Sequence, residues 1–141
     1  MEAFHGTSKN TARSIFSSGI DVTSGGGELG QGFYTTTEYH VAKAWAKKKF
    51  PGNHEIMEFD ICETEFENLN PLLLNKMESM KFRKNIKDGA VQSSYKFDRN
   101  AVWGKIVGGS SSGEDNQIKF ESLCGQNLIN KSRKNINDAH E

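Results

Sequence analysis

The sequence contains no apolar run that approaches the roughly 20 residues of a membrane-spanning helix. Its first ten residues also lack the basic and then apolar pattern of a secretory signal peptide. The two cysteines, Cys62 and Cys124, are far apart and do not have metal-site spacing, so we expect buried free thiols in a reducing compartment. These absences favour a cytoplasmic protein that does not insert into membranes.

Neither sign of charge is in excess, because 18 lysine and arginine residues balance 18 aspartate and glutamate residues. The chain as a whole therefore lacks a strong electrostatic attraction for nucleic acids or acidic membrane surfaces. It lacks a P-loop, since no G-K-[ST] occurs, and a dinucleotide-binding fingerprint, since its glycines over 25–32 lead into a strand instead of a helix. Cofactor sites of these two kinds are excluded, and we expect no metal site.

At 141 residues, with 35% hydrophobic and 26% charged residues, the chain has the size and composition of one domain. Apolar spacing and cap residues predict its elements. They are a strand over 2–6, a helix over 9–18 that begins at Ser8 or Thr11 and ends at Gly19, a flexible glycine-rich loop over 20–32, a strand over 33–37, a helix over 38–50, a strand over 55–63, a helix over 70–88 with Asn70 as its cap, Pro71 first and Gly89 after its end, and strands over 101–109 and 117–123. This order indicates an α+β domain over 1–125 with a mostly antiparallel or split sheet and flanking helices, followed by a polar tail or short helix over 126–141.

Two short stretches contain residue types that suit a planar ligand. In FHGTS, His5 precedes Gly6, a glycine that lets a ligand approach the backbone closely, and Thr7 and Ser8 add hydroxyl groups. In LGQGFYTT, glycines lead into a strand that contains Tyr34. Each stretch also has an ordinary structural interpretation, with the histidine at a strand end and the tyrosine in the core. Neither stretch decides a function alone.

The order of these stretches resembles one known family. An F-H-G-T strand start, a helix that ends in S-G-I, a glycine-rich loop, G-x-G-F-Y-T-T and a helix with A-x-x-W-A are together similar to ADP-ribosyltransferase domains. The nearer likeness is to the diphtheria-toxin-like branch, which has a His-Tyr-Glu motif, and to its small bacterial domains. It covers residues 4–46 well and the strands near 101–123 loosely. The resemblance implies an ADP-ribosyltransferase-like split sheet.

The resemblance also implies that NAD is the substrate and suggests how it is bound. The backbone of Gly6 would pair with the nicotinamide carboxamide, and His5 would hydrogen-bond a ribose hydroxyl. Tyr34 would stack on the nicotinamide ring, which is cationic before cleavage. Further expected contacts with NAD are Thr7, Ser8, Arg13, Gly32 and Tyr39.

The third position of the motif departs from the family. There a glutamate at the start of a late strand stabilises the oxocarbenium-like transition state, whereas the matching residue in NQIKFESL is Gln117. A glutamine binds a ribose hydroxyl but does not offset positive charge. Three explanations stay open: Gln117 is the native catalytic residue, Glu114 or Glu121 acts after a shift in register, or the domain binds NAD without efficient transfer.

The sequence therefore predicts a mono-ADP-ribosyltransferase that cleaves the nicotinamide–ribose bond of NAD and modifies a nucleic acid or a protein. The family further suggests a toxin or defence effector with a neutralising antitoxin. The alternatives are an NAD glycohydrolase, a non-catalytic module that binds NAD or ADP-ribose, and a nucleic-acid-binding domain. The last would use the lysine-rich stretches 43–49, 76–87 and 131–134, which are equally typical of solvated helix faces. The stretch SSSGED over 110–115 is either an acceptor-recognising loop or a hairpin.

Overall fold

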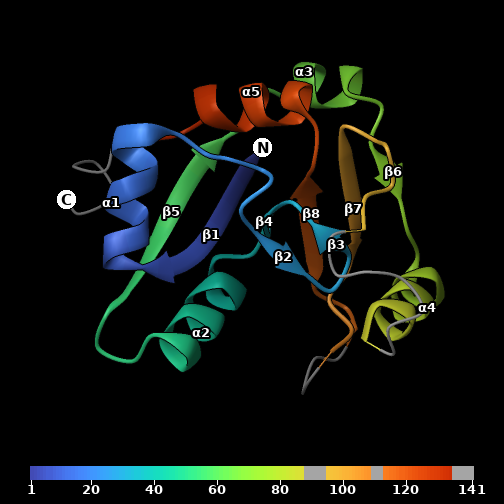
Figure 1. Cartoon of the computed structure of the whole chain (residues 1–141), viewed down its shortest axis with the longest axis horizontal. Helices are drawn as coiled ribbons and strands as arrows, with labels where there is room; N and C mark the ends of the chain where they lie inside the picture. The colour runs from blue at the N-terminus through green and yellow to red at the C-terminus, as the bar shows by residue number, and fades with distance from the viewer. Residues whose placement is uncertain (88–94, 109–112, 135–141) are drawn as a thin grey trace.

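A computed structural model describes residues 1–87, 95–108 and 113–134 of the chain (Figure 1). The elements, in chain order, are β1 (Glu2–Ser8), α1 (Lys9–Ser18), β2 (Gly26–Gly27), β3 (Gly30–Gln31), β4 (Phe33–Thr35), α2 (Tyr39–Lys49), β5 (His54–Asp60), α3 (Glu63–Asn68), β6 (Leu72–Leu73), α4 (Lys76–Lys87), β7 (Ala101–Lys105), β8 (Asn116–Phe120) and α5 (Leu123–Lys131). Strands β1 and β5 form one sheet, β2 and β3 a short hairpin, and β4-β8-β7-β6 a second sheet. Within these described ranges every strand pair except β6–β7 is antiparallel, which confirms the α+β class with a mostly antiparallel sheet.

The first helix follows the sequence signals closely. Ser8 caps α1, since its Oγ accepts a hydrogen bond from the backbone N–H of Thr11 at 3.1 Å. The helix ends at Gly19, whose φ of 88° is accessible to glycine with little strain. The predicted helix over 9–18 is confirmed at both ends, because both signals are local.

Helices α1 and α2 cover opposite faces of the β1–β5 sheet. On one face, Ala12 of α1 packs in a cluster with Ala3 and Met57. On the other face, Gly6 of β1 lies so close to α2 that an added Cβ would sit 2.4 Å from the carbonyl oxygen of Ala42. The position therefore requires a glycine for packing alone.

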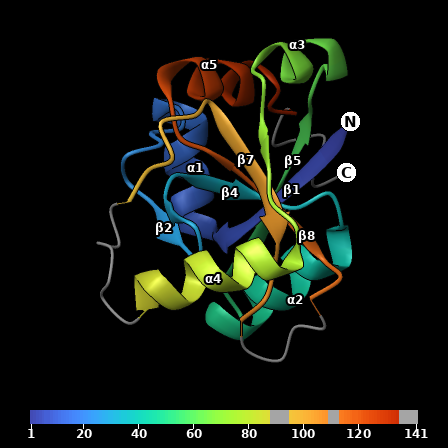
Figure 2. The same cartoon turned by 90° about the vertical axis from the view of Figure 1, so that its right-hand side faces the viewer.

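The four-stranded sheet has two different faces. Along β8, Ile118 and Phe120 point into the first hydrophobic cluster, whereas Gln117 and Lys119 alternate with them toward the other face. Helix α4 lies across that second face (Figure 2), and its Phe82 packs there with a cluster around Leu29 and Val102.

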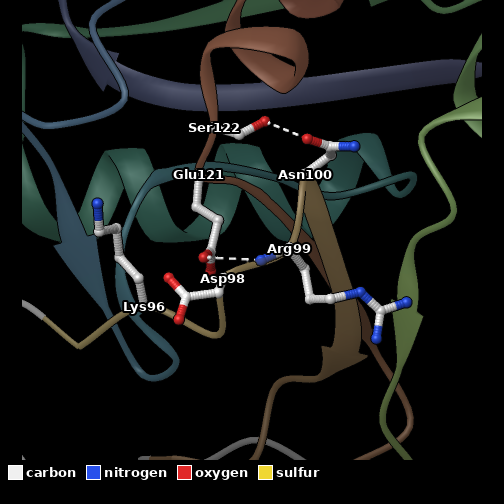
Figure 3. Close-up of a pocket in the computed structure, with 6 residues that line it drawn as sticks. All are labelled: Lys96, Asp98, Arg99, Asn100, Glu121 and Ser122. Carbon is white, nitrogen blue, oxygen red and sulfur yellow. Dashed lines mark hydrogen bonds between the residues drawn. The ribbon is translucent and has the colours of Figure 1, made fainter.

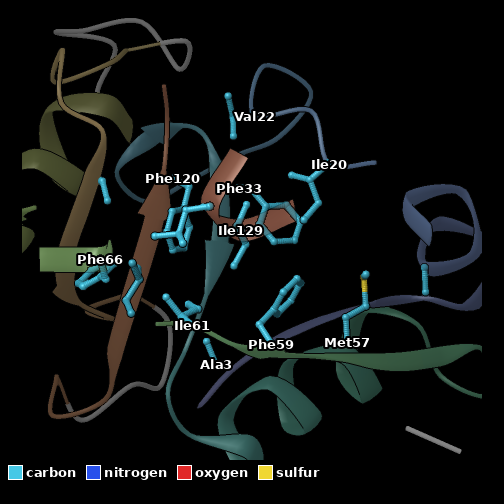
Figure 4. Close-up of a cluster of buried hydrophobic side chains, with 14 residues drawn as sticks. Ala3, Ile20, Val22, Phe33, Met57, Phe59, Ile61, Phe66, Phe120 and Ile129 are labelled. Atoms are coloured by element: carbon cyan, nitrogen blue, oxygen red, sulfur yellow. The ribbon is translucent and has the colours of Figure 1, made fainter. Parts of the chain in front are cut away.

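The first cluster joins the two sheets into one core (Figure 4). It contains Ala3, Met57 and Phe59 from the β1–β5 sheet and Phe33, Ala101, Ile118 and Phe120 from the larger one, together with residues of α3 and α5. Phe33 is buried, as its position in the alternating strand predicts. The core is therefore shared by both sheets and not divided between them.

The predicted helix over 70–88 is wrong in its first third. Leu72 and Leu73 form β6 and pair in parallel with Val102 and Trp103 of β7. The helix that follows begins at Lys76, where Asn75 and Glu78 exchange backbone N–H to side-chain hydrogen bonds of 2.8 and 3.0 Å. Asn70 and Pro71 precede this capping box by a full turn, and the predicted stop at Gly89 lies outside the described residues.

The segment expected to be a polar tail or a short helix begins, in its described part, as a helix. Residues 126–131 complete α5, which places Leu128 and Ile129 in the core, whereas Leu123 begins this helix with an exposed side chain instead of extending β8. Cys62 and Cys124 are free but exposed, so the prediction of buried thiols is wrong. Within the described ranges no helix has both the length and the apolarity to cross a bilayer.

Candidate functional site

His5 lies where β1 meets β4. The contact is made by Phe4 of β1 and Thr36, the residue directly after β4, whose backbone groups exchange hydrogen bonds of 2.8 and 2.9 Å. This contact brings Nδ1 of His5 to 2.5 Å from the carbonyl oxygen of Tyr34 and stacks the imidazole on Phe33 at 4.2 Å between centroids. Two stretches that are far apart in the sequence are thus directly joined.

The surroundings of His5 fix its protonation and tautomer. Burial lowers the pKa of His5 to about 4, a shift that the hydrogen bond to the Tyr34 carbonyl opposes only in part. The imidazole is therefore neutral at pH 7. Because a carbonyl oxygen only accepts, Nδ1 carries the proton and Nε2 has a free lone pair. His5 is a hydrogen-bond acceptor through Nε2, which suits a hydroxyl group.

Tyr34 holds the glycine-rich loop in place. Its hydroxyl donates to the carbonyl oxygen of Gly30 at 2.5 Å and accepts from the N–H of Leu29 at 2.9 Å. Burial raises the pKa of the Tyr34 phenol, so it stays protonated and can make both bonds. A Cβ on Gly27 would lie 2.9 Å from Cζ of the ring, so the loop backbone covers the aromatic face. The ring is not free to stack on a ligand while the loop is in this position.

The side chains of His5 and Tyr34 lie on opposite sides of β4. His5 stacks on Phe33, and neighbouring residues of a strand point to opposite faces. Tyr34 instead packs against the cluster around Leu29 and Val102. The structure therefore joins the two predicted site residues through the main chain and not through a shared side-chain cavity.

The other residues expected to contact NAD have local structural roles or are exposed. Ser8 caps α1, Thr7 is buried in β1, and Gly6 packs on α2. An added Cβ on Gly32 would meet Cγ of Lys119 at 2.3 Å, so this glycine is also required by packing. Arg13 is exposed on α1, and Tyr39 is 44% exposed with its ring edge-on to Phe4.

Gln117 has a carboxylate beside it that the sequence did not reveal. Its Nε2 donates to Oε1 of Glu28 at 3.1 Å and to the carbonyl oxygen of Lys105 at 2.9 Å. Oε1 of Glu28 also accepts from the N–H of Val107 at 3.0 Å, and Oε2 accepts from Nε of Arg83 at 3.1 Å. Glu28 comes from the glycine-rich loop and Arg83 from α4. No periodicity or spacing in the sequence indicates that these three elements meet.

Glu121, one of the two alternatives for the third position, is fully engaged in the core. Its carboxylate pairs with Nζ of Lys119 at 2.8 Å and accepts from the backbone N–H groups of Phe97 and Arg99 at 3.1 and 3.3 Å. Lys119 also donates to the carbonyl oxygen of Leu29 at 2.7 Å, which ties the same loop to β8. The other alternative, Glu114, is exposed before β8.

A pocket of about 260 Å³ lies near the end of β8 (Figure 3) and is lined by Lys96, Asp98, Arg99, Asn100, Glu121 and Ser122. Several of its polar groups are already engaged in hydrogen bonds, both within the lining and with residues outside it. Ser122 donates to Oδ1 of Asn100 at 2.6 Å while it caps α5, and the Glu121 carboxylate is engaged as described above. These contacts close the start of α5 against the chain before β7. The pocket is separate from His5.

The charged groups near the ends of β8 and α5 have mixed roles. Ligand atoms of Glu38, His40 and Asp115 lie within 4.8 Å of one another and are the kind of group that can hold a divalent cation.

The basic side chains of the stretch over 131–134 make contacts within the fold. Lys131 pairs with Glu65, Arg133 donates to the carbonyl oxygen of Ile15, and Lys134 pairs with Glu2 and Glu58. The serine residues of the stretch over 110–115 lie outside the described residues.

Comparison of the chain with protein-family models, curated proteins and solved structures gave no match.

Proposed function

We propose that the chain is an NAD-dependent mono-ADP-ribosyltransferase with an ADP-ribosyltransferase-like split sheet. The observation that carries the proposal is the meeting of three strands. The His5 imidazole of β1 contacts the Tyr34 main chain of β4, and β4 pairs with β8, where Gln117 has the carboxylate of Glu28 at 3.1 Å. These are the three motif positions, in the expected order, with a carboxylate next to the third.

The chemistry of each group suits the substrate. The free lone pair on Nε2 of His5 suits a ribose hydroxyl, because a neutral imidazole accepts without repelling the cationic nicotinamide. Tyr34 stacks on nicotinamide only after the covering loop lifts. Five of the thirteen residues over 20–32 are glycine, which makes such a movement conformationally accessible. The glycine-rich loop in the position that Tyr34 holds is thus a closed state, and NAD binds to an open state in which the loop has lifted from the tyrosine ring.

The reaction breaks one bond and forms another. The bond between C1′ of the ribose and the pyridine nitrogen breaks, and nicotinamide leaves as a neutral molecule with the electron pair. A lone pair of the acceptor forms the new bond to C1′, and the acceptor releases its proton. The developing positive charge on the ribose requires a nearby anionic group. Water as acceptor gives the glycohydrolase reaction.

We further propose that the acceptor is a nucleic acid or a protein, and that the chain acts in the cytoplasm as a toxin or defence effector restrained by an antitoxin protein. These parts depend on the resemblance over residues 4–46. A lysine-rich stretch over 43–49 is exposed on α2 and suits an anionic acceptor. It does not discriminate between RNA, DNA and an acidic protein.

The test uses NAD labelled in the adenylate and cell lysate as a source of acceptors. Transfer predicts labelled macromolecules together with free nicotinamide. Label that is removed by nuclease and survives protease identifies a nucleic acid, and the reverse identifies a protein. Free nicotinamide without labelled macromolecules would establish the glycohydrolase instead. NAD that binds and stays intact would refute catalysis.

Two variants test the site, with one matched control. His5→Ala and Tyr34→Ala should each lower nicotinamide release by about 100-fold, since each removes a group that contacts NAD. Trp45→Ala is the control, because this ring is 50% exposed on the outer side of α2. If Tyr34→Ala released nicotinamide as fast as the control does, the central residue of the proposed site would be misassigned.

A further inference from the structure

We propose that Glu28, which the glycine-rich loop places against Gln117, supplies the catalytic carboxylate at the third position, and that Gln117 orients it. This inference rests on the proposed transferase function and names the residue on which that function depends. The distance of 3.1 Å between Nε2 of Gln117 and Oε1 of Glu28 puts the carboxylate one hydrogen bond away from the position predicted for the family's glutamate.

The hydrogen bonds of Glu28 leave room for a substrate. A carboxylate has about four acceptor positions, two on each oxygen. Oε1 accepts from Gln117 and from the N–H of Val107, and Oε2 accepts from Arg83. Within the described part of the chain, one position on Oε2 is left, and the side chain is 22% exposed. A ribose hydroxyl fits that position.

The three donors also fix the direction of the carboxylate. They come from β8, from the segment after β7 and from α4, so each restrains a different degree of freedom. The backbone of Gly108 lies against the contact between Glu28 and Arg83, because a Cβ there would lie 2.1 Å from Oε2 of Glu28 and 2.4 Å from Nε of Arg83. Such preorganisation is what an electrostatic contribution to catalysis requires. The arrangement explains how a chain with glutamine on β8 still presents an anion there.

Glu121, which directly follows β8, does not offer this. Glu121 is 2% exposed, and its carboxylate pairs with Lys119 and with two backbone N–H groups. Gln117 itself has no charge with which to offset a cationic ribose. Of the two side chains that meet here, Gln117 and Glu28, only Glu28 carries a negative charge.

An anchoring role is the competing explanation, because the same bonds tie the loop to the sheet. The experiment therefore measures nicotinamide release from NAD with cell lysate as the source of acceptors and lysate alone as the blank, the KM for NAD and the melting temperature of the full chain. Glu28→Gln keeps the shape and one acceptor oxygen but removes the charge. Gln126→Ala is the matched anchor control, since Oε1 of Gln126 accepts from the N–H of Val22 at the other end of the loop at 3.1 Å.

We expect Glu28→Gln to lower kcat by about 100-fold with KM changed less than about threefold, and Gln126→Ala to leave kcat within about threefold of the native value. The double variant Glu28→Gln with Gln117→Glu moves the carboxylate to β8. It should recover at least about tenfold of the lost rate with no matching rise in melting temperature, whereas an anchoring role predicts that rate and stability recover together.

The possible results separate the two proposals. Native protein that releases no nicotinamide refutes the transferase function and, with it, the role of Glu28. Active native protein with a Glu28→Gln variant that retains kcat refutes the role of Glu28 alone. If Glu28→Gln loses both activity and thermal stability, the double variant decides. Recovery of rate without recovery of stability supports the carboxylate, whereas no recovery of rate, or recovery of both together, assigns Glu28 to anchoring.

Discussion

The buried ion pair between Lys119 and Glu121 provides the sharpest test of how β8 is stabilised. Nζ of Lys119 lies 2.8 Å from Oε1 of Glu121, with the side chains 0% and 2% exposed. Burial lowers the pKa of Lys119, and the Glu121 carboxylate only partly reverses this shift. The pair therefore stabilises each charge in surroundings that otherwise disfavour it.

Removal of one partner leaves the other charge buried and unpaired. Glu121→Gln and Lys119→Met should each lower the free energy of unfolding by about 3–5 kcal/mol. Lys119→Met also leaves the carbonyl oxygen of Leu29 without its 2.7 Å donor. The double variant has no uncompensated charge, so its loss should be smaller than the sum of the single losses by about 2 kcal/mol or more. A domain that is stable by about 5–15 kcal/mol tolerates each single change.

The assay is urea denaturation at pH 7, followed by tryptophan fluorescence, for all four members of the double-mutant cycle. Lys131→Met is the control, because Lys131 pairs with Glu65 at the surface, where the side chains are 58% and 43% exposed. We expect the control to cost less than about 1 kcal/mol. Additive single effects, each no larger than that of the control, would refute the view that this pair holds the interior of β8 together.

Three further predictions concern the site. Gly6→Ala should lower the free energy of unfolding by about 2 kcal/mol, measured by urea denaturation, because its Cβ would lie 2.4 Å from the Ala42 carbonyl oxygen; an unchanged midpoint would contradict this packing. The pKa of His5 is about 6.5 in the unfolded chain and about 4 in the folded one, so the unfolded chain binds the proton more readily. The native protein should therefore lose up to about 3 kcal/mol as pH falls through that window and keep its full stability above it, whereas His5→Gln should lack this loss. Tyr34→Phe should leave the N–H of Leu29 without its 2.9 Å partner and accelerate hydrogen exchange across the glycine-rich loop, while exchange in α1 stays at the native rate; equal protection in both proteins would show that the phenol does not hold the loop.

Local signals in the sequence predicted the elements whose ends they define. The Ser8 cap and the Gly19 stop predicted both ends of α1 correctly, and strand alternation correctly predicted that Phe33 is buried. The helix predicted over 70–88 failed because a partner outweighed the local pattern. Leu72 and Leu73 pair with β7, a contact across about thirty residues that apolar spacing does not encode. In this chain the Asn75–Glu78 capping box was the true start signal.

The candidate site, like the fold, was predicted only in part from the sequence. The family resemblance selected His5 and Tyr34, and the strand contact between Phe4 and Thr36 does bring them together. It did not predict that their side chains lie on opposite sides of β4, because register and strand direction depend on the tertiary pairing. Glu28 was missed for the same reason, since a glutamate among loop glycines has no pattern until β8 and α4 surround it.

Under the proposed function, the glycine-rich loop serves both as a lid and as part of the site. Tyr34 and Lys119 bind Leu29 and Gly30 in the closed position, while Glu28 on the same loop binds Gln117. If the whole loop lifted, NAD would reach Tyr34 but Glu28 would leave Gln117. The two roles are compatible only if the segment near Gly27 moves while Glu28 stays bound. The bonds of Glu28 to three separate elements favour such a local opening. Under the proposed function, the population of that open state would set the apparent affinity for NAD.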